Sequence, residues 1–444
     1  MHINKMGSPK VDLKYIIVIS LIIAFIGFAG LQPVYAQDDN QSSQSNDSTT
    51  TQYPEKMKDR QTWEWILSSP GLLINLPFTI ALTITEIAVS NLYQPQVVGW
   101  MYDVTTSDDS LRAIRPAYSS RSGLGLKVYQ KDLLNKGSYI ELAAKAGLSN
   151  RQKYQLRFEQ FDLYRKTLYM DLILGYRFLH EERFYGIGPD TKEEAQTSYT
   201  FERGWAILNL GTRLTGRIDL MGIFSLEQSS VLGRKVTDIP ATRDMYTLAE
   251  LPGLESEVKI MSARLNAKYD SRDSKGGPRR GQLIDLSWGM FSQIDDDDYG
   301  FWQAAADIRQ YVHIFYGRTL VFRLAGQLTE PVSGKEIPFY NLSDLGPTET
   351  IRGFSRSRFR DNDMVLGSIE YRYPIYDRNN SVIDAFLFVD AGQVSHDLFQ
   401  EFEADNLQFG FGGGFRVWSG EVESLNLILG KSKERFRIDF VVNN

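Results

Sequence analysis

The stretch Phe436-Arg437-Ile438-Asp439-Phe440-Val441-Val442 alternates large apolar side chains with charged ones. In a β-strand, successive side chains point to opposite faces, so the aromatic and aliphatic residues share one face and the charges the other. A soluble β-sandwich also alternates, but it does not normally place charged residues on the buried side of many strands. A second stretch, Leu172-Ile173-Leu174-Gly175-Tyr176-Arg177-Phe178, has a similar rhythm. The pattern favours a membrane β-barrel, whose outer face is apolar and whose interior is polar.

The number of strands follows from searching the whole chain for segments with this alternation. Fifteen segments of this type occur between residues 121 and 442, whereas a single-chain bacterial barrel has an even number of strands. Counting back from the last strand places the longest connection, 330–362, between strands eleven and twelve. The missing first strand is then expected between about Trp100 and Tyr118. The prediction is an all-β fold, a 16-stranded antiparallel transmembrane β-barrel over residues 97–444.

The N-terminal region predicts export. Lys5, Lys10 and Lys14 precede an apolar run from Tyr15 to Leu31, and Val34-Tyr35-Ala36 has the small and branched residues of a cleavage site. We therefore expect a signal peptide over residues 1–36 and a location in the outer membrane of a Gram-negative-type envelope. The chain has no cysteine, which excludes a lipoprotein anchor and disulfides. Residues 37–61 are rich in Ser, Thr, Asn, Asp and Gln, as is typical of a flexible tether.

A short amphipathic helix is expected over residues 62–96, before the barrel. Polar residues recur there every three or four positions, which places them on one helical face. Such a helix can lie in the membrane interface, plug a barrel, or pack as a buried structural element, and tryptophans suit an anchor at headgroup level. The two tryptophans are Trp63 and Trp65, and the apolar face consists of Leu73, Leu76, Ile80, Ile84 and Ile87.

Enzymatic and metal-binding interpretations lack support in the residues. Only four histidines occur, and His180, His313 and His396 have no companions at ligand spacing. The acidic run Asp295 to Asp298 lacks the spacing of a calcium loop, which favours a solvated loop. The glycine cluster Gly410 to Phe415 lacks the setting of a phosphate loop and suggests a strand against which neighbouring side chains pack. We expect no catalytic residues, no metal, no cofactor and no nucleic-acid partner.

Four arginines fall in nine residues of the stretch Thr348 to Met364, TETIRGFSRSRFRDNDM, although the net charge of the chain is −6. Basic clusters usually meet anionic partners. The segment Ile351-Arg352-Gly353-Phe354 resembles the V/I-R-G-F/Y motif of the BamA/TamA superfamily of outer-membrane proteins, also called the bacterial surface antigen family. Four other segments resemble family segments in the expected order: Arg183 to Thr191, Tyr269 to Gln282, Gly367 to Ile375, and Phe388-Val389-Asp390-Ala391-Gly392.

The resemblance implies that the long loop folds back into the lumen. Arg352 would pair with Asp390 of the F-x-D-x-G segment that ends at Gly392, and Glu370 would be a second acidic partner. A guanidinium can bind a carboxylate through two parallel hydrogen bonds, and Gly353 would permit a tight turn. For Arg356, Arg358 and Arg360 two alternatives remain: an internal position or a solvated basic surface.

The resemblance also implies a function. Principal assembly members of the family carry several small periplasmic (POTRA) domains, and this sequence is similar to the subgroup that lacks them. The chain would help to insert or translocate client proteins at a lateral seam, which is formed by the first strand and the last, with Phe436, Ile438 and Phe440 on the lipid side. The alternatives are a passive pore, a structural barrel, or the membrane subunit of a complex. Expected partners are outer-membrane lipid, client proteins, and a periplasmic or membrane protein.

Overall fold

The computed structural model describes most of the chain after residue 105: residues 106, 107, 109, 111–119, 121–133, 137–147, 150–164, 167–233, 239–346, 349–378, 381–419 and 422–442. The predicted signal peptide, the tether at 37–61 and the amphipathic helix at 62–96 lie outside the described residues and stay predictions. Within the described part, no helix is long and apolar enough to cross a membrane.

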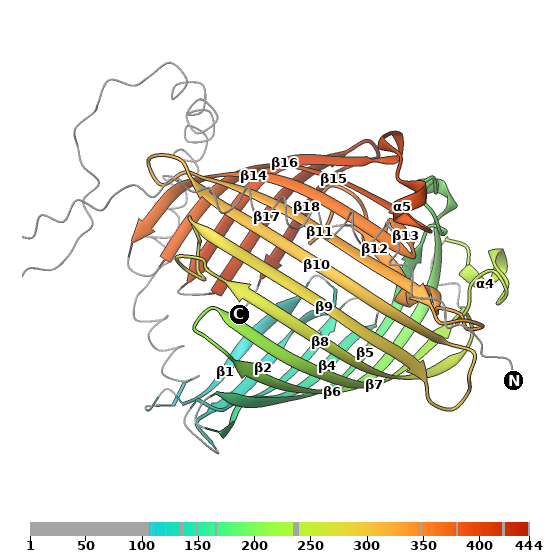
Figure 1. Ribbon diagram of the computed structural model, residues 1–444, viewed down its shortest axis with the longest axis horizontal. Coiled ribbons are helices and arrows are strands. Elements are labelled where there is room, and N and C mark those ends of the chain that lie inside the picture. Colours follow the sequence, from blue (N-terminus) through green and yellow to red (C-terminus); the bar gives the residue numbers. More distant parts are fainter. Residues whose placement is uncertain are drawn as a thin grey trace, which may run out of the picture. The chain divides into compact units, whose positions relative to one another are not determined.

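The described residues form one antiparallel sheet of sixteen strands, each paired with the next along the chain (Figure 1). The strands are β1 (Arg112–Ser119), β2 (Gly123–Lys131), β3 (Tyr139–Gly147), β4 (Arg151–Tyr164), β5 (Leu168–Phe184), β6 (Thr197–Arg213), β7 (Ile218–Leu232), β8 (Glu257–Asp270), β9 (Gly281–Gln293), β10 (Gly300–His313), β11 (Thr319–Pro331), β14 (Asp363–Arg378), β15 (Ser381–Ser395), β16 (Gln408–Ser419), β17 (Val422–Ser432) and β18 (Phe436–Val442).

The predicted strand number and the missing first strand are both confirmed. The missing strand is β1, which pairs with β2. Strands eleven and twelve are β11 and β14, and their connection contains a separate hairpin of β12 (Ser343–Leu345) and β13 (Phe359–Asp361). Short helices lie in four connections: η1 (Glu193–Ala195) between β5 and β6, α4 (Thr242–Met245) between β7 and β8, η2 (Phe339–Asn341) between β11 and β12, and α5 (Leu398–Glu401) and η3 (Ala404–Asn406) between β15 and β16.

The sheet closes into a barrel except at one seam. Within the sheet, β1 forms a ladder only with β2, and β18 only with β17, although the rings of Tyr118 and Phe440 approach within 6.3 Å between centroids. On the other edge of β1, Ala113 forms one isolated bridge with Thr106. The two terminal strands are therefore neighbours whose backbones form no ladder among the described residues.

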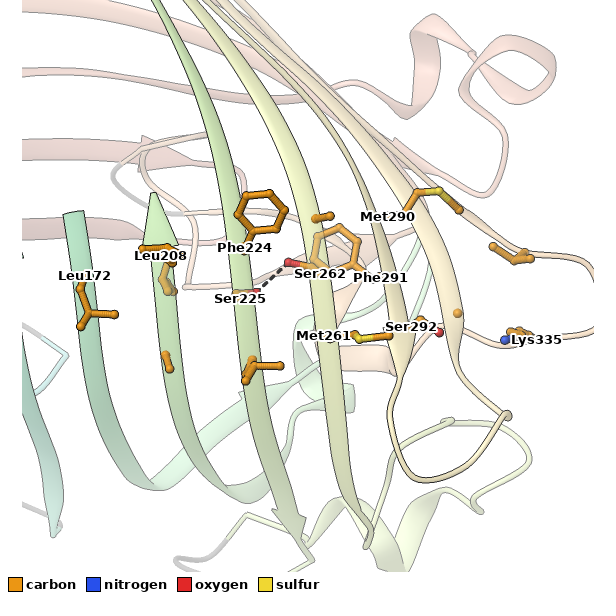
Figure 2. Close-up of a pocket in the computed structure, with 16 residues that line it drawn as sticks. Leu172, Leu208, Phe224, Ser225, Met261, Ser262, Met290, Phe291, Ser292 and Lys335 are labelled. Carbon is orange, nitrogen blue, oxygen red and sulfur yellow. Dashed lines mark hydrogen bonds between the residues drawn. The ribbon is translucent and has the colours of Figure 1, made fainter. Parts of the chain in front are cut away.

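The outward face is apolar, as the alternation predicts. Outward positions on β7, β8 and β9, such as Phe224, Met261 and Met290, are exposed large apolar residues. Between them lies a groove of about 610 Å³ on β5 to β10, with Phe224, Met261 and Met290 among its lining residues (Figure 2). At intervening positions Ser225 and Ser262 are buried and joined by a 2.7 Å hydrogen bond. The outward face thus suits lipid chains.

The long connections pack together at one rim, around Phe339 of η2. Its ring lies edge-on to Phe184, at 5.4 Å between centroids, and to Tyr199, at 5.2 Å. Leu251 and Leu254 of the β7–β8 connection complete this core. Loops that are far apart in sequence are therefore held as one buried unit at the rim.

The long turn at 271–280 spans the opposite, short-connection rim. Arg279 Nη2 donates to Asp384 Oδ1 of β15 at 2.7 Å. A Cβ placed on Gly277 would lie 3.3 Å from Val382 and 3.4 Å from Trp418, so this turn contacts β15 and β16 as well as joining β8 to β9. Because the turn is long, it reaches β15 and β16, which are not neighbours of β8 or β9 in the sheet.

Candidate functional site

The candidate site is centred on Arg352, which lies in the loop that connects β12 to β13. On β14 and β15, Ile369 and Val389 are exposed, whereas the adjacent Glu370 and Asp390 are buried. Side chains alternate along a strand, so the two carboxylates face the interior. Since Arg352 contacts both, the loop lies inside the barrel.

Arg352 binds Asp390 through a bidentate interaction. Nε donates to Oδ2 at 2.8 Å, Nη2 donates to Oδ1 at 2.7 Å, and the backbone N–H of Arg352 adds a 3.0 Å bond to Oδ2. Asp390 has 0% of its surface exposed. Charge-assisted bonds of this fork geometry are among the strongest polar contacts in proteins.

Glu370 extends the pair into a network of charges. It accepts from Arg352 Nη1 at 2.7 Å, from Arg372 Nε at 2.7 Å and from Arg416 Nη1 at 2.8 Å. The Arg352 guanidinium also lies over the ring of Phe388, 3.6 Å from its centroid. Burial alone would lower the pKa of Arg352, but the hydrogen bonds and charge of Asp390, followed by those of Glu370, raise it.

Apolar residues on both sides of Arg352 anchor the same loop. Ile351 and Phe354 are fully buried, and they pack with Leu345 of β12, Phe359 of β13, Leu366 of β14 and Val394 of β15. The rings of Phe354 and Phe359 lie 5.2 Å apart between centroids. At Gly392, an added Cβ would lie 3.0 Å from the Val365 carbonyl oxygen and 3.1 Å from Leu345. The predicted loop and strand residues are therefore brought together.

The loop tip rests against a wall of bare backbone. Gly353 has φ +93°, a conformation that favours glycine, and Ser432 Oγ donates to its carbonyl at 2.9 Å. A Cβ on Gly410 of β16 would overlap the Arg352 carbonyl oxygen, and one on Gly430 of β17 would lie 2.7 Å from the Gly353 nitrogen. The expectation that neighbouring side chains pack on the glycine cluster is wrong at Gly410, where the neighbour is loop backbone.

Two further arginines of this loop are also internal. Arg358 is 2% exposed; its Nε donates to Glu434 Oε1 at 2.9 Å, and its Nη2 donates to the Thr191 carbonyl at 2.6 Å. Arg360 is 7% exposed, donates to the Phe339 carbonyl at 3.3 Å and lies beside the ring of Phe184. The solvated-surface alternative is therefore wrong for both. Sequence reasoning named no partner for Arg358, although Thr191 lies in a quoted family-like segment.

At the seam, Phe436, Ile438 and Phe440 of β18 are exposed on the outward face. Between them, Arg437 Nη2 donates to Asp439 Oδ1 at 2.7 Å on the inner face. The alternation of the opening stretch thus separates a lipid-facing surface from a charged interior surface.

Among the described residues, no cluster of three or more His, Asp or Glu side chains could hold a metal ion. In the acidic run, Asp295 accepts from Lys259 Nζ at 3.0 Å, and Asp297 pairs with Lys335. These pairs are those of a solvated loop at the rim.

An apolar exterior, a polar interior and an internal loop define a transmembrane β-barrel of the outer-membrane type. The Omp85 superfamily domain matches residues 132–434, and the chain belongs to that family. Its barrels are transport and assembly proteins of the bacterial outer membrane and are not enzymes, so the predicted superfamily and location are confirmed. The likeness to the subgroup without POTRA domains stays a prediction.

Solved structures match this chain at low sequence identity, and the first of them shows the same fold. BamA from Haemophilus ducreyi lacking POTRA domains 1–3 matches with 17% identity and a TM-score of 0.54, over 74% of this chain and 69% of that one. CdiB from Acinetobacter baumannii matches with 12% identity and a TM-score of 0.46, over 74% of this chain and 57% of that one. CdiB from Escherichia coli also has 12% identity and a TM-score of 0.46, over 73% and 59%. No curated protein matches the sequence.

Proposed function

We propose that this barrel helps to insert or translocate other proteins at the outer membrane through the seam between β1 and β18. The observation that carries the proposal is that β1 and β18 form no ladder with each other, and each forms a ladder with one neighbouring strand only. An unpaired strand edge presents backbone donors and acceptors, and a client segment can add to it as a further strand.

The contacts of Arg352 suit a latch that holds the loop against the wall beside the seam. Its tip touches Gly410 of β16 and Gly430 of β17, and β17 pairs directly with β18. Arg358 extends the hold to Glu434, in the turn between β17 and β18. The proposed role of these contacts is to stiffen the side of the seam formed by β16 to β18 while β1 moves.

A reversible crosslink across the seam tests the proposal. The chain has no cysteine, so Tyr118→Cys with Phe440→Cys, joined by a short cleavable thiol crosslinker, would link β1 to β18 specifically. We expect other outer-membrane barrels to fall in abundance when this variant is the sole copy, and to recover when the link is cleaved. Client levels that stay unchanged with the seam linked would count against assembly or translocation.

The matched control places the same link inside the sheet. Leu126→Cys with Ala144→Cys joins paired positions of β2 and β3, which never separate in this mechanism. This link should leave client levels unchanged. A fall with both links would show that the crosslinking itself is harmful.

The alternative is a passive pore or a structural barrel, for which bilayer conductance of the purified protein is the direct measurement. The internal loop and its charge network occupy the lumen beside β14 to β17, which argues against a wide channel. A docking role for residues 61–96 would be tested by co-purification of partners with and without that segment.

A further inference from the structure

A second polar site lies in the interior beside the seam. It is a cavity of about 240 Å³, here named the seam-side arginine pocket, and it is separate from the Arg352 network. Ser355 of the loop, two glutamates at the end of β5 and Asp439 of β18 contribute to it. Its five arginines are Arg121, Arg151, Arg183, Arg356 and Arg437.

The pocket carries more positive than negative charge. Five arginines against Glu181, Glu182 and Asp439 leave an excess of two. Each of the three carboxylates forms an ion pair with one arginine: Glu182 with Arg121 at 3.2 Å, Glu181 with Arg183 at 3.7 Å, and Asp439 with Arg437 at 2.7 Å. Among the described residues, Arg151 and Arg356 make no ion pair.

Several hydrogen-bond donors in the pocket also lack a partner. The Nε atoms of Arg121 and Arg151 are buried without an acceptor in the described structure, as is the hydroxyl of Ser355, a residue only 3% exposed. Burial, followed by the charge of Arg121, lowers the pKa of Arg356. Unpaired buried donors and charges are costly, so an arrangement of this kind favours a bound anion.

We propose that the seam-side arginine pocket binds a phosphate group. Guanidinium forks match the oxygens of phosphate, and several forks with one hydroxyl suit a group with more than two acceptor oxygens. The pocket lies at the rim of the long connections, beside the seam. The phosphate can therefore come from a lipid headgroup or from free phosphate. The proposal does not depend on the barrel acting on client proteins.

The test measures the thermal midpoint of the folded full chain in detergent, with inorganic phosphate or with chloride at equal ionic strength. A ligand that binds only the folded state raises this midpoint. Phosphate should raise the wild-type midpoint more than chloride does. Arg356→Gln should raise the midpoint without phosphate, because it removes a half-buried charge that has no ion pair, and should abolish the increment specific to phosphate.

Two other variants keep the result interpretable. Ser355→Ala should lower the apparent phosphate affinity several-fold, although the charge of the pocket is unchanged. If Arg356→Gln does not fold, Ser355→Ala by itself tests the proposal. Arg243→Gln, an exposed arginine on the same rim, should keep the full phosphate increment. Equal midpoints in phosphate and chloride would overturn the proposal, and so would an increment that survives both pocket variants.

Short-chain phosphatidic acid distinguishes the two sources. Stabilisation at lower concentrations of this lipid than of inorganic phosphate would identify a lipid headgroup as the ligand. Stabilisation by inorganic phosphate at equal or lower concentration would identify the free ion. No stabilisation by either would again overturn the site.

Discussion

At the scale of single residues, burial separates the arginines of one short loop into different roles. Arg352 and Arg358 are deeply buried and each has carboxylate partners, whereas Arg356 faces a pocket in which cations exceed anions. Buried ion pairs are not in themselves strongly stabilising, but removing one partner leaves a charge without compensation. Neighbouring arginines should therefore respond very differently to the same substitution.

The Arg352–Asp390 pair can be tested by a double-mutant cycle. Arg352→Ala and Asp390→Ala should each lower the free energy of unfolding by about 3–5 kcal/mol. The first leaves buried Asp390 without an ion pair, and the second removes the bidentate partner of buried Arg352, which then keeps only Glu370. The double variant should cost little more than either single one, as measured by urea unfolding of the folded barrel in detergent. Additive losses would exclude a direct energetic coupling.

Arg358 and Arg356 should differ in the same measurement. Arg358→Ala leaves Glu434 unpaired and should cost about 3–5 kcal/mol, whereas Arg356→Ala breaks no ion pair and should leave stability unchanged or raise it. Glu434→Gln should reproduce most of the Arg358 loss. Equal losses at both arginines would contradict the assignment.

At the scale of elements, the loop is held by backbone fit as much as by charge. Glycines at 410 and 430 allow the backbone of Arg352 and Gly353 to approach β16 and β17 more closely than any side chain would permit. The close approach brings the guanidinium within reach of Asp390, so packing of the loop and formation of the ion pair are linked.

Gly410→Ala should therefore displace the loop tip. We expect a loss of about 1–3 kcal/mol from overpacking, together with faster cleavage of residues 349–362 in limited proteolysis. Gly204→Ala is the matched control, because a Cβ there would meet no atom within 4 Å. If both variants behave like the wild type, the position of the loop tip does not depend on the lack of a side chain at Gly410.

At the scale of the whole barrel, the sheet is braced unevenly. The turn at 271–280 contacts β15 and β16 through Arg279 and Gly277, and the long loop braces β14 to β17 from inside. β1 has neither brace, forms a ladder with one neighbour only and spans eight residues. The sheet is therefore expected to open at β1.

Amide hydrogen exchange measures this directly. Backbone amides of β1 should exchange faster than those of β8, which pairs with strands on both sides. Local opening requires less free energy where fewer hydrogen bonds and contacts are lost. Uniform protection across both strands would argue against a labile seam.

Local pattern determined much of this protein before any tertiary information. Period-two alternation determines which side chains share a face, and the even strand count of closed barrels located β1 without a clear pattern in its own residues. The proximity of Arg352 to Asp390 came from the family-like motifs. Neither the alternation nor the count could place that pair.

Only the tertiary structure decided what the interior contacts are. Arg358 meets Glu434 across 76 positions and Thr191 across 167, and Arg356 meets Arg121 and Ser355 in a shared pocket. These pairings depend on the strand register and on the path of a loop through the lumen. Alternation specifies the face of a strand but carries no information about which distant residue lies opposite, because barrel closure and loop packing bring those residues together.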